Sequence, residues 1–127
     1  MRQILGMRKI DMIHTKYQTG TESNRYRIVI PNVVLEKLNL SCNDYIAFEK
    51  KNGDVHLTKE INILTRAICR FNGLDIRKIR SKNRVYLSSE IVSFLRIKDG
   101  DYLVFIESKK GNIRLHRLRK MKMQRGE

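Results

Sequence analysis

The chain repeats itself: displaced by 57 positions, residues 27–31 (RIVIP) align with residues 84–88 (RVYLS). Further identities in this register are Leu38 and Leu95, Asp44 and Asp101, Tyr45 and Tyr102, Phe48 and Phe105, and, after a one-residue gap, Gly53 and Gly111 and Leu57 and Leu115. Apolar residues also pair at Ile28 and Val85, Ile30 and Leu87, Val34 and Ile91, Leu40 and Ile97, Ile46 and Leu103, and Val55 and Ile113. The chain therefore contains two copies of one unit, and a unit of roughly fifty residues buries too little surface to be stable alone.

Each copy contains a strand in which apolar and polar residues alternate. In the first copy, Ile28 and Ile30 point one way, whereas Arg25, Arg27 and Val29 point the other. Such alternation is typical of a strand with one buried face and one exposed face. We therefore predict a solvent face that carries arginine.

A short helix and a hairpin follow each strand. Pro31 ends the first strand, and we predict Asn32 as the N-cap of the first helix and Ser88 or Ser89 as that of the second. The residues that these helices are expected to bury are Val34, Leu35 and Leu38, and Ile91, Val92 and Leu95. Turns are predicted at residues 41–44 and 98–101, and hairpin reversals at Asn52 and Gly53 and at Gly111 and Asn112. The resulting fold class is mainly β with short helices.

The net charge narrows the choice of partner. Lys and Arg number 27 against 13 Asp and Glu, which gives +14 at pH 7. A charge this large on a small domain favours a phosphate polymer as partner. Residues 1–60 hold 10 basic and 7 acidic residues, whereas residues 61–127 hold 17 and 6, so the second half supplies most of the attraction.

Other classes of protein find little support in the residues. No stretch approaches the ~20 apolar residues of a membrane span, and residues 1–6 are too short for the apolar region of a signal peptide, so we expect a cytoplasmic protein. Cys42 and Cys69 lack metal-ligand spacing, and we expect neither zinc nor a disulfide. His14, His56 and His116 are widely separated, and no nucleophile, carboxylate pair or phosphate loop is evident. We therefore predict a protein without a cofactor that is not an enzyme.

Residues 7–11 (MRKID) and 76–88 (IRKIRSKNRVYLS) resemble the opening of the repeat of the AbrB/MazE/SpoVT family. The resemblance covers about residues 7–59 and 76–117. It implies a swapped-hairpin β-barrel, formed here as an intramolecular pseudo-dimer because both halves lie in one chain. The expected divisions are a first half-barrel at 1–60, a connecting segment at 61–75, a second half-barrel at 76–118 and a basic tail at 119–127. Two chains that exchange halves in a homodimer are an equally valid alternative.

The two copies differ in the spacing between the two arginines of their opening segments. Arg8 and Arg27 are 19 residues apart, whereas Arg77 and Arg84 are 7 apart, so the first copy carries twelve extra residues. We predict that residues 12–24 form a long polar loop. In the connecting segment, Ile61, Leu64 and Ile68 have helical spacing and predict a short covering segment.

The resemblance also implies DNA-facing residues on the opening hairpins. These positions are Arg8, Arg27, Arg77 and Arg84, and the cations beside them are Lys9, Arg25, Lys78, Arg80 and Lys82. Arg117 and the tail residues Arg119, Lys120, Lys122 and Arg125 add further cations, which we interpret as a phosphate-binding arm or as a solvated chain end. Tyr26 and Tyr86 are candidates for stacking on bases. Arginine pairs that some family members carry on the short helix are replaced here by Leu35-Glu36 and Val92-Ser93.

Three functions are consistent with these residues. The first is a DNA-binding transcription regulator or nucleoid-associated protein, which the resemblance and the hairpin arginines favour. The second is an RNA- or ribosome-binding protein that uses the same basic face. The third is a MazE-like antitoxin, which the basic tail disfavours, because such proteins typically hold their toxin with an acidic and apolar segment.

Overall fold

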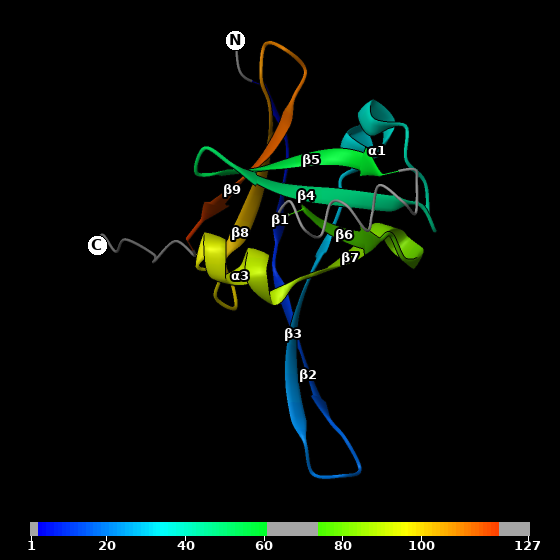
Figure 1. Cartoon of the computed structure of the whole chain (residues 1–127), viewed down its shortest axis with the longest axis vertical. Helices are drawn as coiled ribbons and strands as arrows, with labels where there is room; N and C mark the ends of the chain where they lie inside the picture. The colour runs from blue at the N-terminus through cyan, green and yellow to red at the C-terminus, as the bar shows by residue number, and fades with distance from the viewer. Residues whose placement is uncertain (1–2, 61–73, 120–127) are drawn as a thin grey trace, which may run out of the picture.

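The structure is a computed structural model that describes residues 3–60 and 74–119. These residues form two antiparallel sheets and two short α-helices (Figure 1). The elements are β1 (Gln3–Lys9), β2 (Asp11–Lys16), β3 (Glu22–Val29), α1 (Asn32–Leu38), β4 (Tyr45–Lys51), β5 (Asp54–Glu60), β6 (Leu74–Lys78), η1 (Ser81–Asn83), β7 (Arg84–Leu87), α3 (Ser89–Leu95), β8 (Tyr102–Glu107) and β9 (Ile113–Leu118). The mainly-β class predicted from the sequence is confirmed.

The two halves of the chain share their sheets. In the six-stranded sheet the strand order is β1-β8-β9-β5-β4-β6, so the opening strand of each half pairs with the other half. The backbone N–H of Ile10 donates to the Asp101 carbonyl at 2.8 Å, and that of Ile79 donates to the Asp44 carbonyl at the same distance. The second sheet, β2-β3-β7, joins the halves again through β3 and β7. Both halves are therefore needed to complete either sheet.

The sheets do not close into the barrel that was predicted. In the described residues, the edge strands of the three-stranded sheet, β2 and β7, form no ladder with the edge strands β1 and β6 of the larger sheet. Between β6 and β7 the structure has only a single bridge, from Arg80 to Arg84. The strand β7 is only four residues long, and β2 runs into a hairpin with β3 that projects away from the larger sheet (Figure 1).

Residues from equivalent positions of the repeat fill the space between the sheets. The buried pairs are Ile28 and Val85, Ile30 and Leu87, Val34 and Ile91, Leu40 and Ile97, Ile46 and Leu103, Phe48 and Phe105, Val55 and Ile113, and Leu57 and Leu115. Ile10 and Ile79, which the sequence did not assign to the core, are also fully buried where β1 and β6 end. The alternation predicted for the repeat is therefore confirmed.

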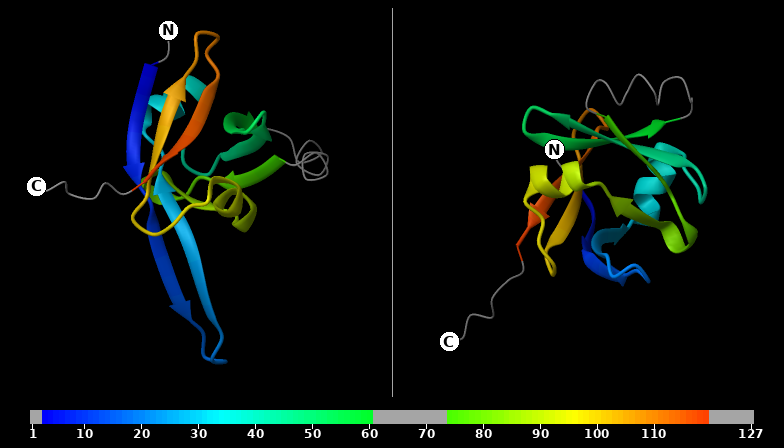
Figure 2. Two further views of the ribbon diagram at one scale, coloured as in Figure 1. Left: turned by 90° about the vertical axis from the view of Figure 1, so that its left-hand side faces the viewer. Right: turned by 60° about the horizontal axis from the view of Figure 1, so that its bottom comes forward.

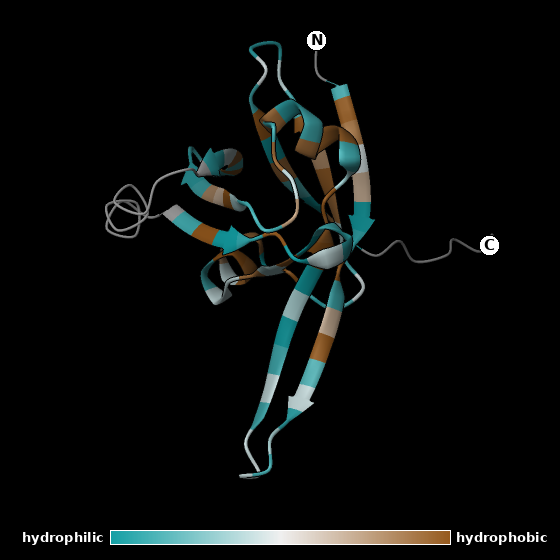
Figure 3. Ribbon diagram, turned by 90° about the vertical axis from the view of Figure 1, so that its right-hand side faces the viewer, coloured by the Kyte–Doolittle hydropathy of each residue, from teal (hydrophilic) through white to brown (hydrophobic). Residues whose placement is uncertain are grey.

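Residues 12–24 form a hairpin where a polar loop was predicted. The strands β2 and β3 pair from Asp11 with Arg27 to Lys16 with Glu22. They project from the rest of the molecule as a long arm (Figures 1 and 2). In Figure 3 the arm is mostly hydrophilic, whereas the hydrophobic residues gather in the body. The loop prediction failed because backbone pairing rather than an apolar face holds this segment together.

The two helices begin differently and end alike. Helix α1 has Pro31 at its N-cap with no side-chain cap, so the prediction of Asn32 as the N-cap was wrong. Helix α3 is capped as predicted, because Ser88 Oγ accepts from the Ile91 N–H at 3.1 Å. Both helices end at a left-handed residue with φ 55°, which is Asn39 in α1 and Arg96 in α3. These ends lie at equivalent positions of the repeat.

Some predictions concern residues that the structure does not describe. Most of the connecting segment, with Ile61, Leu64 and Ile68, and also Cys69, lies outside the described residues. The tail residues Lys120, Lys122 and Arg125 lie outside them as well. The strand β6 begins at Leu74, two residues before the predicted start of the second half. Cys42 is a free, exposed cysteine.

Candidate nucleic-acid interface

The exposed face of the three-stranded sheet carries a cluster of arginines around one tyrosine. In the register of β3 and β7, Arg27 lies opposite Tyr86 and Val29 lies opposite Arg84. Because side chains alternate along a strand, Arg25 lies on this face as well. The neighbouring Ile28 and Val85 are fully buried, so the arginine side of the sheet faces away from the core.

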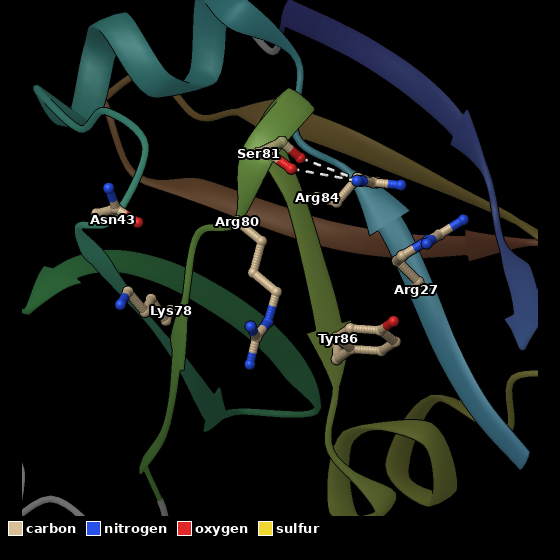
Figure 4. A pocket seen from close by; sticks show the side chains of 7 residues that line it. All are labelled: Arg27, Asn43, Lys78, Arg80, Ser81, Arg84 and Tyr86. Carbon is tan, nitrogen blue, oxygen red and sulfur yellow. Dashed lines mark hydrogen bonds between the residues drawn. The ribbon is translucent and has the colours of Figure 1, made fainter. Parts of the chain in front are cut away.

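Beside Tyr86 the surface forms a hollow of about 260 Å³ (Figure 4). The described residues that line it are Arg27, Asn43, Lys78, Arg80, Ser81, Arg84 and Tyr86. They come from β3, β6 and β7 and from the turns before β4 and β7, which the exchange of strands between the halves brings together. None of these described lining residues is acidic. The hollow therefore concentrates positive charge and suits an anionic ligand.

Two arginines of this hollow differ in how they are held. Arg84 Nε donates to the Ser81 carbonyl at 3.1 Å, and Arg84 Nη2 donates to Ser81 Oγ at 3.2 Å. These bonds fix the guanidinium before any ligand arrives. By contrast, Arg27 Nε is buried without a hydrogen-bond partner among the described residues. A buried donor without a partner costs free energy, and the Arg27 side chain would have to shift for this nitrogen to reach a phosphate oxygen.

A second hollow, of about 330 Å³, lies on the other side of Tyr86. Its lining includes Arg25 and Arg77, together with serines at the start of α3. The Arg77 Nε atom lies 3.5 Å from Asp75 Oδ1, which lowers the net charge of this hollow relative to the first. Tyr26 also lines it, but its ring packs partly buried against the core, which leaves Tyr86 as the better placed of the two stacking candidates.

The cations of the first opening strand lie elsewhere. Arg8 and Lys9 pair across β1 with Leu103 and Tyr102 of β8, and neither residue lines the two hollows. Their counterparts Arg77 and Lys78 pair with Ile46 and Tyr45 of β4 in the same way and do line them. The structure therefore brings together only some of the candidate residues that were predicted from the sequence.

The remaining described candidates lie outside the hollows. Lys82 is exposed in η1 with a left-handed φ of 61°. Arg117 lies opposite Leu103 on β9, and its Nη1 atom is buried without a hydrogen-bond partner among the described residues. Arg119 Nη1 lies 3.4 Å from Asp101 Oδ2, a carboxylate that is almost fully buried. Arg119 therefore contacts a buried carboxylate of the body, and its place in a phosphate-binding arm stays a prediction.

The sequence did not single out Asn43 and Ser81, which also line the first hollow. Asn43 has a left-handed φ of 77° in the turn before β4, and the equivalent position of the second copy is Gly100, with φ 88°. The repeat alignment gave a signal for the turn, but none for its proximity to β7.

The described histidines and acids gather into no candidate metal site. His14 Nδ1 and Nε2 lie 2.6 Å from Asn24 Oδ1 and 2.9 Å from Glu22 Oε1 on the arm. Within residues 3–60 and 74–119, no cluster of three or more His, Cys, Asp or Glu side chains could hold a metal ion. Neither described helix has the length and the apolar run that a bilayer span requires.

Comparison with known proteins identifies no relative: no family model, no curated protein and no solved structure matches the chain.

Proposed function

We propose that this chain binds nucleic acid through the basic face, by which we mean Arg25, Arg27, Lys78, Arg80 and Arg84 around Tyr86. The observation that carries the proposal is the convergence of four of these cations on one hollow whose described lining contains no acid. Guanidinium groups bind phosphate oxygens in bidentate fashion, and several of them on one rigid sheet would bind a phosphate backbone strongly.

Duplex DNA is the proposed target, in a transcription regulator or nucleoid-associated protein of the AbrB type. The exchange of β1 and β6 between the halves supports the idea of a swapped-hairpin pseudo-dimer within one chain. In the family that the sequence resembles, the basic opening hairpins face DNA. Here β3, β6 and β7 supply the corresponding cations. An RNA-binding protein that uses the same face is the second candidate, which Tyr86 favours because RNA presents unpaired bases more often.

Salt dependence of binding tests this proposal. Binding of a short random-sequence DNA duplex is measured at several salt concentrations for the wild type and for Arg27→Gln/Lys78→Gln. Each lost phosphate contact should reduce the slope of log K against log salt by about 0.9, so the double variant should lose about 2 and should bind at least about tenfold more weakly.

A matched control removes the same charge elsewhere. Lys109→Gln/Lys110→Gln changes two exposed cations in the turn between β8 and β9 and should leave the slope nearly unchanged. Equal losses in both double variants would show that net charge alone attracts DNA and that the basic face is not the site. A structured RNA that competes much better than the duplex would replace DNA with RNA as the target.

A further inference from the structure

Two guanidinium groups flank the ring of Tyr86 at different distances. Arg25 Cζ lies 3.7 Å from the ring centroid, whereas Arg80 Cζ lies 5.9 Å from it. Arg25 comes from β3, which pairs with β7, and Arg80 precedes β7 on the side away from β3. Figure 4 shows Arg80 extending alongside the ring, with Arg27 on the opposite side. Arg25 therefore stacks on Tyr86, and Arg80 faces it across a gap.

The gap is nearly wide enough for a nucleobase. Carbon atoms in contact lie about 3.5–4.0 Å apart, so a planar base between two flat groups needs about 7 Å between them. Arg80 would have to move outward by about 1 Å. Its side chain is exposed, which allows such a movement. A base in this position would stack on tyrosine on one side and on a guanidinium on the other.

The same place can hold the phosphate of the bound nucleotide. Tyr86 lines the hollow together with Arg27, Lys78 and Arg84. Arg84 is already fixed by Ser81, and Arg27 Nε lacks a hydrogen-bond partner among the described residues. A stacking ring beside several cations is the combination that single-stranded nucleic acids require.

The arrangement occurs once in the described part of the molecule. At the positions related by the pseudo-symmetry of the repeat, Val29 replaces Tyr86, Asp11 replaces Arg80 and Lys82 replaces Arg25. The aliphatic Val29 side chain cannot stack on a base as a tyrosine ring does. The carboxylate of Asp11 cannot neutralise a phosphate as a guanidinium does. The pseudo-symmetry of the fold therefore does not produce a second copy of the site.

We propose that Tyr86, Arg25 and Arg80 form a clamp for one unpaired nucleotide, such as a bulged base or a base in a single-stranded stretch. The clamp rests on the proposed binding of nucleic acid by the basic face. It adds that the molecule binds a strand with an unpaired base more tightly than a fully paired one.

The test compares a duplex that carries one bulged 2-aminopurine with a fully paired duplex of the same flanking sequence, prepared both as DNA and as RNA. Wild-type protein should bind the bulged form about 5- to 150-fold more tightly than the paired form, as DNA, as RNA or as both. The nucleic acid with the larger ratio is the preferred target. Binding should quench the 2-aminopurine fluorescence, because the base stacks on the ring. Tyr86→Phe should retain both effects, since it keeps the aromatic face.

Tyr86→Leu should abolish the preference and the quenching, while the melting temperature, which reports the fold, changes little. Tyr17→Leu, at an exposed tyrosine on the tip of the arm, is the matched control and should behave like the wild type. Equal binding of bulged and paired forms by the wild type, or a preference that survives Tyr86→Leu, would overturn the clamp. In that case salt-dependent binding of the paired duplex would still support the proposed function, whereas failure to bind any of the nucleic acids would overturn both proposals.

Discussion

The turn aspartates Asp44 and Asp101 make the same hydrogen bond in different surroundings. Asp44 Oδ2 accepts from the Ser41 N–H at 2.8 Å, and Asp101 Oδ2 accepts from the Lys98 N–H at the same distance. Asp44 is half-buried, whereas Asp101 is 3% exposed and also lies beside Arg119. Loss of a partner costs more where water cannot replace it, so the two turns should differ in their sensitivity to substitution.

We expect Asp101→Ala to lower the free energy of unfolding by about 2–3 kcal/mol, and Asp44→Ala by about 1 kcal/mol. At the second turn the Lys98 N–H loses the buried Asp101 carboxylate as its charged acceptor, whereas at the more exposed first turn water can take the place of Asp44. Urea denaturation of the three proteins measures the difference. Asp99→Ala, at an exposed neighbour, should stay within about 0.5 kcal/mol of the wild type. Equal effects at the two turn aspartates would contradict the role given to burial.

At the scale of single residues, the sequence predicted some members of the site but not which of them lie together. The resemblance implied Arg27 and Arg84 as DNA-facing residues, and Tyr86 was a candidate for stacking on bases. It grouped them with Arg8, which lies on β1 against β8 and away from the hollows. Which cations converge depends on pairing between strands far apart in the chain, and residue types alone do not determine this.

Among the elements, the β2–β3 arm departs most from the sequence prediction. Residues 11–24 are exposed or half-exposed on both faces, so no apolar alternation marks them as strands. Cross-strand contacts such as His14 with Asn24 accompany the backbone pairing. The rest of the repeat was predictable because its strands and helices each bury one face, which leaves a periodic signal in the sequence.

Shortening the arm should leave both the fold and nonspecific binding intact. Replacing residues 14–24 with Asn-Gly keeps the pair Ile13 and Arg25 and closes it with a two-residue turn. The removed segment contains no buried residue, and its charges, Lys16 and Glu22, cancel. Thermal melting should therefore change little, and affinity for a random duplex should stay within about threefold, because phosphate attraction depends on the cations that remain. A large loss of affinity would show that the arm itself contacts the nucleic acid.

On the scale of the whole molecule, the two halves are similar in structure and unequal in surface chemistry. They exchange opening strands and contribute equivalent residues to one core. Cations nevertheless line the hollows beside Tyr86, whereas the equivalent positions of the first half include Asp11 and Val29. We therefore expect the chain to bind in one orientation on an asymmetric site, unlike a homodimer, whose two identical halves favour a palindrome.

The most direct test of the central claim is ultraviolet crosslinking in the native host, followed by identification of both the nucleic acid and the crosslinked peptide. We expect fragments that are sensitive to DNase, crosslinked to peptides that contain Tyr86 or residues 25–27, because these lie on the basic face. Crosslinked material that is sensitive to RNase and resistant to DNase would contradict the assignment of DNA. Crosslinks confined to strands β1, β8, β9 and β5, none of which carries a residue of the basic face, would contradict the assigned face itself.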